Sequence, residues 1–351
     1  MTTIKHVAQR AGVSVSTVSH ALSGKRPVSD ETRARIFQAI AELGYQPSIH
    51  AQSLVTGYSR TIGILFPLEG SGSGIATLNT IQLEMIMEAN AVAQSNGYSL
   101  QLFTQAEDEL SLRALCRTCD GLLVSMVRLH DPRVDYLLKE RYPFVMMGRP
   151  EQANHVAWVD TDFEDMVMKQ IAHLVELNHR QIVFLDRPER LFEKELGYTV
   201  RARYGYLQAC EAFGLTPIIY SCEVSVEDGR RTMHQILDAR PDITALAAFN
   251  DVAAVGAYYA LPERGLRAPD DFSIIAFTSP GFLQATMPSM TAMNNTGSLV
   301  SKVAAELLLN QLKGEVVESR QILIKSELIP GKTTGLAPAR QKQAIKRNAG
   351  S

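Results

Sequence analysis

TIKHVAQRAGVSVSTVSHAL, residues 3–22, contains two short amphipathic helical patterns separated by a turn. From Ile4 onward, apolar residues recur at the i, i+3, i+4 and i+7 positions that share one face of a helix, and Thr3 is a suitable cap. Gly12 provides the backbone freedom that a tight turn needs, and Ser14 can cap a second helix over residues 15–22. This order predicts a helix-turn-helix, whose second helix typically enters the major groove of DNA.

A third helix is predicted after the turn-forming residues 27–29. Asp30 and Glu31 suit the positive end of its dipole, and Gly44 ends it. Its buried stripe is predicted to be Ile36, Ile40 and Leu43. The pattern alone also fits a three-helix bundle with no role in DNA binding.

The charge of the chain is unevenly distributed. The 351 residues carry a formal net charge of −2, yet residues 1–60 contain seven Lys or Arg against three Asp or Glu. The rest of the chain is therefore acidic. A basic head on an acidic body is expected where only the head contacts phosphates.

The composition is that of a globular protein, with 46% hydrophobic residues and four cysteines. The first residues contain no apolar signal region, and the chain has no apolar run of about 18 residues. Four cysteines are too few for a disulfide framework. We expect a cytoplasmic protein with no membrane partner.

Residue 61 begins a different pattern, in which short apolar runs alternate with helical stretches. Alternation of this kind predicts parallel sheets covered on both faces, and two such units leave a cleft where their strands end. The predicted helices are 78–96, 162–177, 204–213 and 252–264. The predicted strands are 61–67, 98–103, 121–126, 144–147, 181–185, 244–249 and 272–277.

The head resembles that of the LacI/GalR family of bacterial transcriptional regulators. The resemblance rests on residues 3–8 (TIKHVA), 11–14 (AGVS), 17–22 (TVSHAL) and 28–33 (VSDETR), and it continues nearly ungapped to Pro47. It implies a homodimeric repressor that binds a pseudo-palindromic operator and responds to a small effector, a sugar or related metabolite.

The resemblance also implies an organisation. An all-α helix-turn-helix head over residues 1–46 is followed by a hinge over 47–60. An α/β body over 61–335 has two parallel-sheet subdomains, like a periplasmic binding protein, and serves effector binding and dimerisation. Residues 336–351 are expected to be a disordered tail, basic and polar at its end.

The resemblance assigns DNA-contacting roles by position. Val15, Ser16 and His20 would read base edges from the second helix, and Arg26 would reach the DNA from the following loop. Phosphate contacts, which position the helix without reading sequence, are assigned to Lys5, Thr17 and Ser19.

The hinge is too short to form a stable isolated helix, so we expect it to be ordered only when held. In the family, paired hinge helices enter the minor groove and wedge a leucine into the central base step. The matching residue is Leu54, with Ala51 allowing the second helix to approach closely. Ser48 and Gln52 depart from the Asn and Arg common in the family.

The effector pocket is expected at strand ends of the body. Asn250 and Asp251 match the family's pocket-lining pair, and their side chains can bind vicinal hydroxyls. Asp160 faces the same cleft, and Arg149 lies in a turn seen in sugar-responsive members.

Two departures from the family pattern concern the effector. Ala202 occupies the position of the usual effector-binding arginine, so either Arg201 or Arg203 would take that role, with Arg203 preferred. Thr278 stands where an aspartate is usual, which removes a carboxylate clamp on a diol. A simple sugar is therefore less firmly implied.

Other motifs are weaker. GSGSG, residues 70–74, does not complete the dinucleotide fingerprint, and Cys116 and Cys119 have no second pair or histidine to complete a zinc site. We expect no metal, no cofactor and no enzymatic activity. Two other functions stay open, a sugar receptor whose head contacts protein and an NAD-dependent enzyme.

Dimerisation is expected through helices beside the cleft. The first of them, residues 78–96, carries the stripe Ile81, Met85 and Ala89. A closed dimer sets the spacing of the two heads on two half-sites.

Leu54→Ala is expected to leave the fold intact while weakening operator binding and removing most of the DNA bend, because the wedge is lost. Bending measured by gel mobility on the operator checks this. An unchanged bend would show that the wedge is not Leu54.

Overall fold

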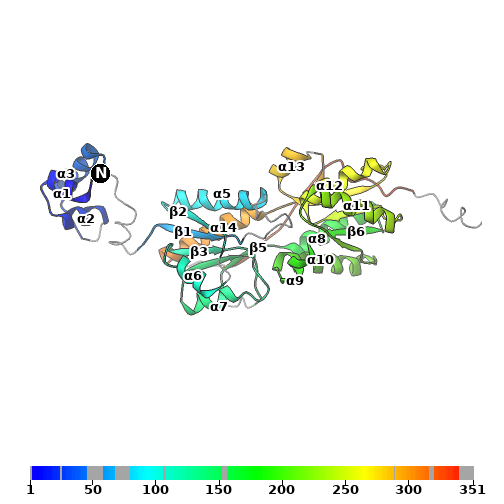
Figure 1. Ribbon diagram of the computed structural model, residues 1–351, viewed down its shortest axis with the longest axis horizontal. Coiled ribbons are helices and arrows are strands. Elements are labelled where there is room, and N and C mark those ends of the chain that lie inside the picture. The colour runs from blue at the N-terminus through cyan, green and yellow to red at the C-terminus, as the bar shows by residue number, and fades with distance from the viewer. Residues whose placement is uncertain are drawn as a thin grey trace, which may run out of the picture.

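The computed structural model describes residues 2–23, 26–45, 58–67, 80–105, 108–151, 156–287, 289–315 and 320–339. A small helical head precedes two α/β subdomains (Figure 1). The hinge residues Ala51 and Leu54 and the GSGSG segment lie outside the described residues.

The head consists of α1 (Ile4–Ala11), α2 (Val15–Ser23) and α3 (Asp30–Leu43). Gly12 ends α1 in the left-handed conformation, with φ of 64°. Ser14 Oγ accepts a hydrogen bond of 3.1 Å from the backbone N–H of Thr17, so it caps α2 as predicted. The predicted bounds of all three helices are confirmed to within one residue. Their shared core includes Val7, Ala8, Ala11, Val18, Ala21, Ile36, Ala39 and Tyr45.

The first subdomain is a parallel sheet of order β11-β5-β4-β3-β1-β2. Helices α5 (Thr80–Ser95) and α14 (Gly297–Lys313) pack on one face, and α6 (Glu109–Leu115) and α7 (Pro132–Lys139) pack on the other. The strands are β1 (Thr61–Leu65), β2 (Ser99–Phe103), β3 (Gly121–Val124), β4 (Phe144–Met147), β5 (Trp158–Thr161) and β11 (Gln321–Ile324).

The second subdomain repeats this plan with the order β12-β10-β9-β8-β6-β7, in which β10 and β12 pair antiparallel and the other strands pair parallel. Helices α11 (Val226–Ala239), α12 (Asp251–Glu263) and α13 (Pro280–Thr286) contribute to the core on one face. On the other face lie α8 (Phe163–Glu176) and α10 (Gly197–Phe213), with the short α9 (Glu189–Glu193) beside α10. The strands are β6 (Ile182–Asp186), β7 (Ile219–Ser221), β8 (Ala245–Ala248), β9 (Ser273–Thr278), β10 (Thr291–Asn294) and β12 (Leu328–Ile329).

The chain crosses between the subdomains three times, after β5, after β10 and after β11. The crossings are bonded to one another. The hydroxyls of Thr161 and Thr296 are buried and lie 2.8 Å apart. Ser326 Oγ donates to the Asn294 carbonyl at 2.6 Å, and the Asp162 N–H donates to the Ile324 carbonyl at 2.9 Å. The ends of both sheets are therefore tied together at one place.

The seven strands predicted from apolar runs are all present, and the fold class is confirmed. Strands β5, β7, β10, β11 and β12 were not among the predicted ranges, because none of them lies in a continuous apolar run like FVMM of β4. Helix α10 begins at Gly197, seven residues before the predicted start at 204. Ala337 donates to the Leu177 carbonyl, so the contacts of the body extend to the start of the expected tail.

The expected dimer stripe on α5 is wrong. Ala89 is fully buried, and Met85 packs against the subdomain core. The outward apolar residues are Leu83, 48% exposed, and Met87, 70% exposed. The stripe faces inward because α14 packs against α5, which the sequence pattern of α5 alone does not reveal.

In the described part of the chain, helices are too short or too polar to cross a bilayer.

Thr296→Val is expected to destabilise the body by about 1–3 kcal/mol, because the buried Thr161 hydroxyl loses its partner. Changing both threonines to valine should cost less than the sum of the single changes, since neither hydroxyl is then left unpaired. Urea unfolding of the four proteins measures this coupling, and strictly additive effects would contradict it.

Candidate nucleic-acid interface and ligand cavity

The outward face of α2 is polar and small. Val15 is 40% exposed and Ser16 is exposed, while Val18 on the opposite side is fully buried against the head core. Ser14 Oγ lies 2.7 Å from Ser16 Oγ and 2.8 Å from Thr17 Oγ1. The cap thus orders the hydroxyls at the helix start, and a hydroxyl can both donate to and accept from DNA.

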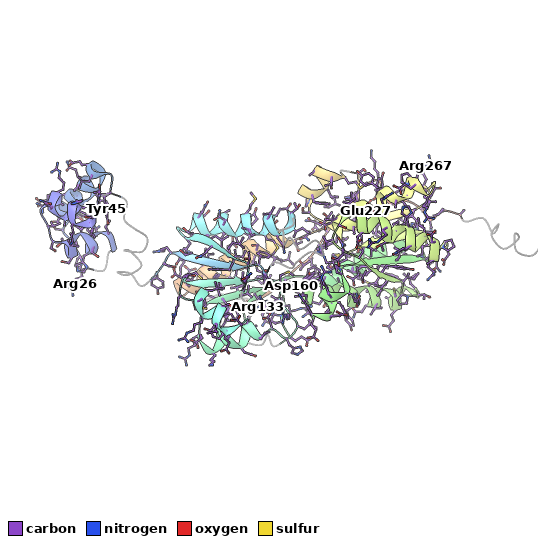
Figure 2. The ribbon with its side chains drawn as sticks, in the orientation of Figure 1. Arg26, Tyr45, Arg133, Asp160, Glu227 and Arg267 are labelled. Atoms are coloured by element: carbon purple, nitrogen blue, oxygen red, sulfur yellow. The ribbon has the colours of Figure 1, made fainter. Side chains whose placement is uncertain are left out.

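The remaining head residues assigned to DNA lie at different depths. Lys5 and Arg26 are exposed, and Arg26 projects from the edge of the head (Figure 2). Ser19 and His20 are half-buried. His20 Nδ1 is buried without a hydrogen-bond partner in the described structure, which leaves a polar atom unsatisfied beside the outward face.

A cavity of about 650 Å³ lies between the two subdomains. Both contribute to its lining, so its shape depends on how they are held together by the three crossings. From the first subdomain come residues that include Phe66, Ser125, Met147, Arg149, Asp160 and Val300. From the second come residues that include Phe163, Arg187, Arg190, Tyr198, Glu223, Asp228, Phe249 and Phe277.

Asp160 is the penultimate residue of β5 and lies at the cavity wall, near the centre of the body (Figure 2). Its carboxylate accepts the N–H of Arg149 at 3.1 Å and that of Thr161 at 2.9 Å. Burial raises the pKa of Asp160 to about 7, and the positive charge of Arg201 partly offsets this effect. The group is therefore able to change protonation near neutral pH.

Arg149 and Arg201 link the subdomains beside Asp160. Arg149 donates to Glu164 at 2.7 Å, across from the first subdomain to α8 of the second. Arg201, on α10, donates to the Arg149 carbonyl at 2.7 Å. Arg201 does not itself line the cavity, but it supports the residue that does.

Arg203, the preferred arginine, lies outside the cavity. Its guanidinium donates to Asp186 at 2.7 Å and to Glu189, and it stacks on Phe192 at 3.8 Å. The hydrogen bonds that Arg203 donates to Glu189 are the main cause of the raised pKa of the Arg203 guanidinium. This arginine holds α9 against α10.

Asn250, Asp251 and Thr278 also lie outside the cavity lining. Asn250 caps α12 by accepting from the Ala253 N–H at 3.2 Å, and Thr278 donates to Asp251 at 3.3 Å. Thr278 and Phe277 lie on opposite sides of β9, because successive strand residues alternate, whereas Asn250 and Asp251 are held at the start of α12. The neighbours Phe249, Val252 and Phe277 line the cavity in their place.

The sequence prediction missed Arg187, Arg190 and most of the aromatic lining. Arg187 directly follows β6, so the strand-end rule that selected Asn250 would also have selected it. The aromatic residues gave no such signal, because aromatic residues in apolar segments are equally expected in the hydrophobic core. Within the described ranges, no group of three or more His, Cys, Asp or Glu could hold a metal ion.

Comparison with known proteins agrees with this architecture. Residues 3–48 match the family model of bacterial regulatory proteins, lacI family, and residues 171–334 match that of a periplasmic binding protein-like domain. The chain is 30% identical over 346 residues to the HTH-type transcriptional repressor PurR of Erwinia tasmaniensis, with 97% of this chain and 99% of that protein covered. It is 28% identical over 351 residues to the HTH-type transcriptional regulator AglR of Rhizobium meliloti, with 96% and 95% covered.

A solved structure shares the whole fold. The lac repressor dimer bound to operator and the anti-inducer ONPF matches with a TM-score of 0.80 at 24% identity, covering 95% of this chain and 99% of that one.

Asp160→Asn is expected to flatten the pH dependence of stability. The folded protein keeps a proton on Asp160 up to about pH 7, whereas the unfolded chain releases it near about pH 4. The free energy of unfolding therefore falls through this group as pH rises across that window, and it is highest below it. Urea unfolding at several pH values should show a smaller decline for the variant.

Asp270→Asn, at an exposed carboxylate, is the matched control and should follow the wild-type curve. Parallel curves for Asp160→Asn and the wild type would contradict the buried, shifted state of Asp160.

Proposed function

Because the chain belongs to the lacI family of bacterial regulatory proteins, which are DNA-binding transcriptional regulators and not enzymes, we propose that it is a cytoplasmic homodimeric repressor whose operator binding is controlled by a small effector in the body. The observation that carries the proposal is the pairing of a capped, outward-facing α2 with a cavity shared by two subdomains.

The head is proposed to bind with the start of α2 in the major groove. Val15 offers an apolar contact for a thymine methyl group, and Ser16 and His20 offer hydrogen-bonding atoms to base edges. Lys5 and Arg26 are exposed, as phosphate or loop contacts require.

Two copies are proposed to pair through the exposed side of α5. Leu83 and Met87 lie one turn apart and present apolar surface to solvent. Helices α13 and α12 lie along the same side of the body as α5 (Figure 1), and Tyr259 of α12 is also exposed. Ser279 at the start of α13 donates to Glu84 of α5 at 2.8 Å, which joins this side across the two subdomains.

Effector control is proposed to act through the relative placement of the subdomains. A ligand in the cavity contacts residues of both, so it binds one placement better than another and shifts the equilibrium by that difference. Arg149 is the natural coupling residue, since it lines the cavity and its side chain bonds to Glu164 of the other subdomain.

The proposal predicts salt-dependent, sequence-specific binding. Selection from random DNA should yield a pseudo-palindrome, since a two-fold dimer places two equivalent heads on the duplex. Lys5→Ala should weaken binding to all sequences and lower the log–log salt slope by about 0.9 per head, the value for one lost phosphate contact. Gel shifts between low and moderate salt measure both quantities.

Arg10→Ala is the matched control, because Arg10 lies on the same helix but pairs with Glu42 at 2.5 Å. It should keep the wild-type slope. If no DNA fragment shifts at low salt, the proposal fails, and a receptor whose head contacts protein takes its place.

A further inference from the structure

We propose that the effector is an organic anion, a carboxylate on a flat apolar body, with the carboxylate bound by Arg187. This rests on the proposed function, because it assigns the chemistry of the cavity that the function uses.

The first observation is the charge balance inside the cavity. Two of the three arginines that line it have acidic partners: Arg149 pairs with Glu164, and Arg190 pairs with Glu223. Arg187 lines the same cavity, forms no ion pair with any described residue, and its Nε is buried without a hydrogen-bond partner. It is therefore a positive charge without a counter-charge.

The acids near Arg187 are already engaged. Asp186 is bound by Arg203 at 2.7 Å, and its carboxylate also accepts the backbone N–H of Arg187 at 2.8 Å. Asp228, on the cavity wall, pairs with Arg231 and accepts the N–H of Glu223 at 3.0 Å. Among the residues that the structure describes, none of the salt bridges engages the guanidinium of Arg187, and a ligand carboxylate would neutralise it.

The second observation is how Arg187 is held. Its guanidinium carbon lies 5.7 Å from the ring centre of Tyr198 and 5.5 Å from that of Phe249. Stacking on these faces fixes the plane of the guanidinium before any ligand arrives. A planar, pre-oriented pair of N–H donors matches the two oxygens of a carboxylate.

The third observation is the wall around Arg187. Phe249 stacks with Phe277 at 5.5 Å and meets Phe163 edge-on at 5.8 Å, and all three rings line the cavity. Rings favour a flat apolar body over a hydroxylated one. The residues suited to clamp a diol, Asn250 and Asp251, are bonded elsewhere and outside the lining.

The test uses the full-length protein and the smallest probe with both features, benzoate. Benzoate should raise the melting temperature in a saturable way, because it binds the folded state, and benzyl alcohol, which has the same ring without the charge, should not. Inorganic phosphate tests the anion without the ring and should give the smaller shift. Binding constants are then measured by calorimetry.

Arg187→Met keeps the aliphatic packing against Tyr198 and Phe249 but removes the charge, and it should weaken benzoate binding roughly tenfold or more. Arg187→Lys should retain part of the affinity. Arg267→Met, at an exposed arginine at the far end of the second subdomain (Figure 2), removes the same charge outside the cavity and should bind as the wild type does.

Equal shifts with benzyl alcohol, full benzoate binding by Arg187→Met, or no response to benzoate at millimolar concentration would each overturn the proposal. A stronger response to phosphate would also overturn it, in favour of a phosphorylated effector. DNA binding of the unliganded protein is measured in parallel. A protein that binds an operator but not benzoate refutes this inference alone, whereas loss of DNA binding refutes the proposed function.

Discussion

The bonded crossing of the three strands between the subdomains is the constraint on which the rest of the body depends. Two domains joined by a single segment are free to rotate relative to each other. Here three segments connect the subdomains, and the hydrogen bonds of Thr161, Thr296 and Ser326 join these segments, which restricts the relative rotation. Because the strands of both sheets end near these passes, the polar and aromatic residues at the strand ends face one another. The cavity is thus a consequence of topology, and any ligand in it acts on the same restricted motion.

The ionic contacts around the cavity have two different roles. Arg149, Arg201 and Glu164 join one subdomain to the other, so their geometry depends on how the subdomains are placed. Arg203, Asp186 and Glu189 join elements of a single subdomain and stay together whatever that placement is. Buried charges are costly unless paired, and both groups satisfy this rule. The guanidinium of Arg187 forms no ion pair with a described residue, and we therefore infer that it binds the ligand.

Much of the head and of the fold class was predictable because the determining signals are local. Ser14 and Gly12 act on their own helix ends, and the helical stripes of the head bury against each other over short distances in the chain. The seven strands were predictable because the apolar character of each is visible in consecutive residues. The candidate cavity was predicted less well. Asp160 and Arg149 lie on its wall as expected, while Asn250, Asp251 and Thr278 follow the right strands but turn away from it.

The sequence by itself determined that a basic helix-turn-helix precedes an α/β body, because helix caps, hydrophobic periodicity and charge are properties of neighbouring residues. Only the tertiary structure decided which side chains share the cavity and which side of α5 is free. Those depend on residues far apart in the chain: α14 covers the stripe of Met85 and Ala89, and Arg203 binds the carboxylate of Asp186, the residue next to Arg187. Such pairings follow from how the sheets are joined, and no single segment of sequence contains that information.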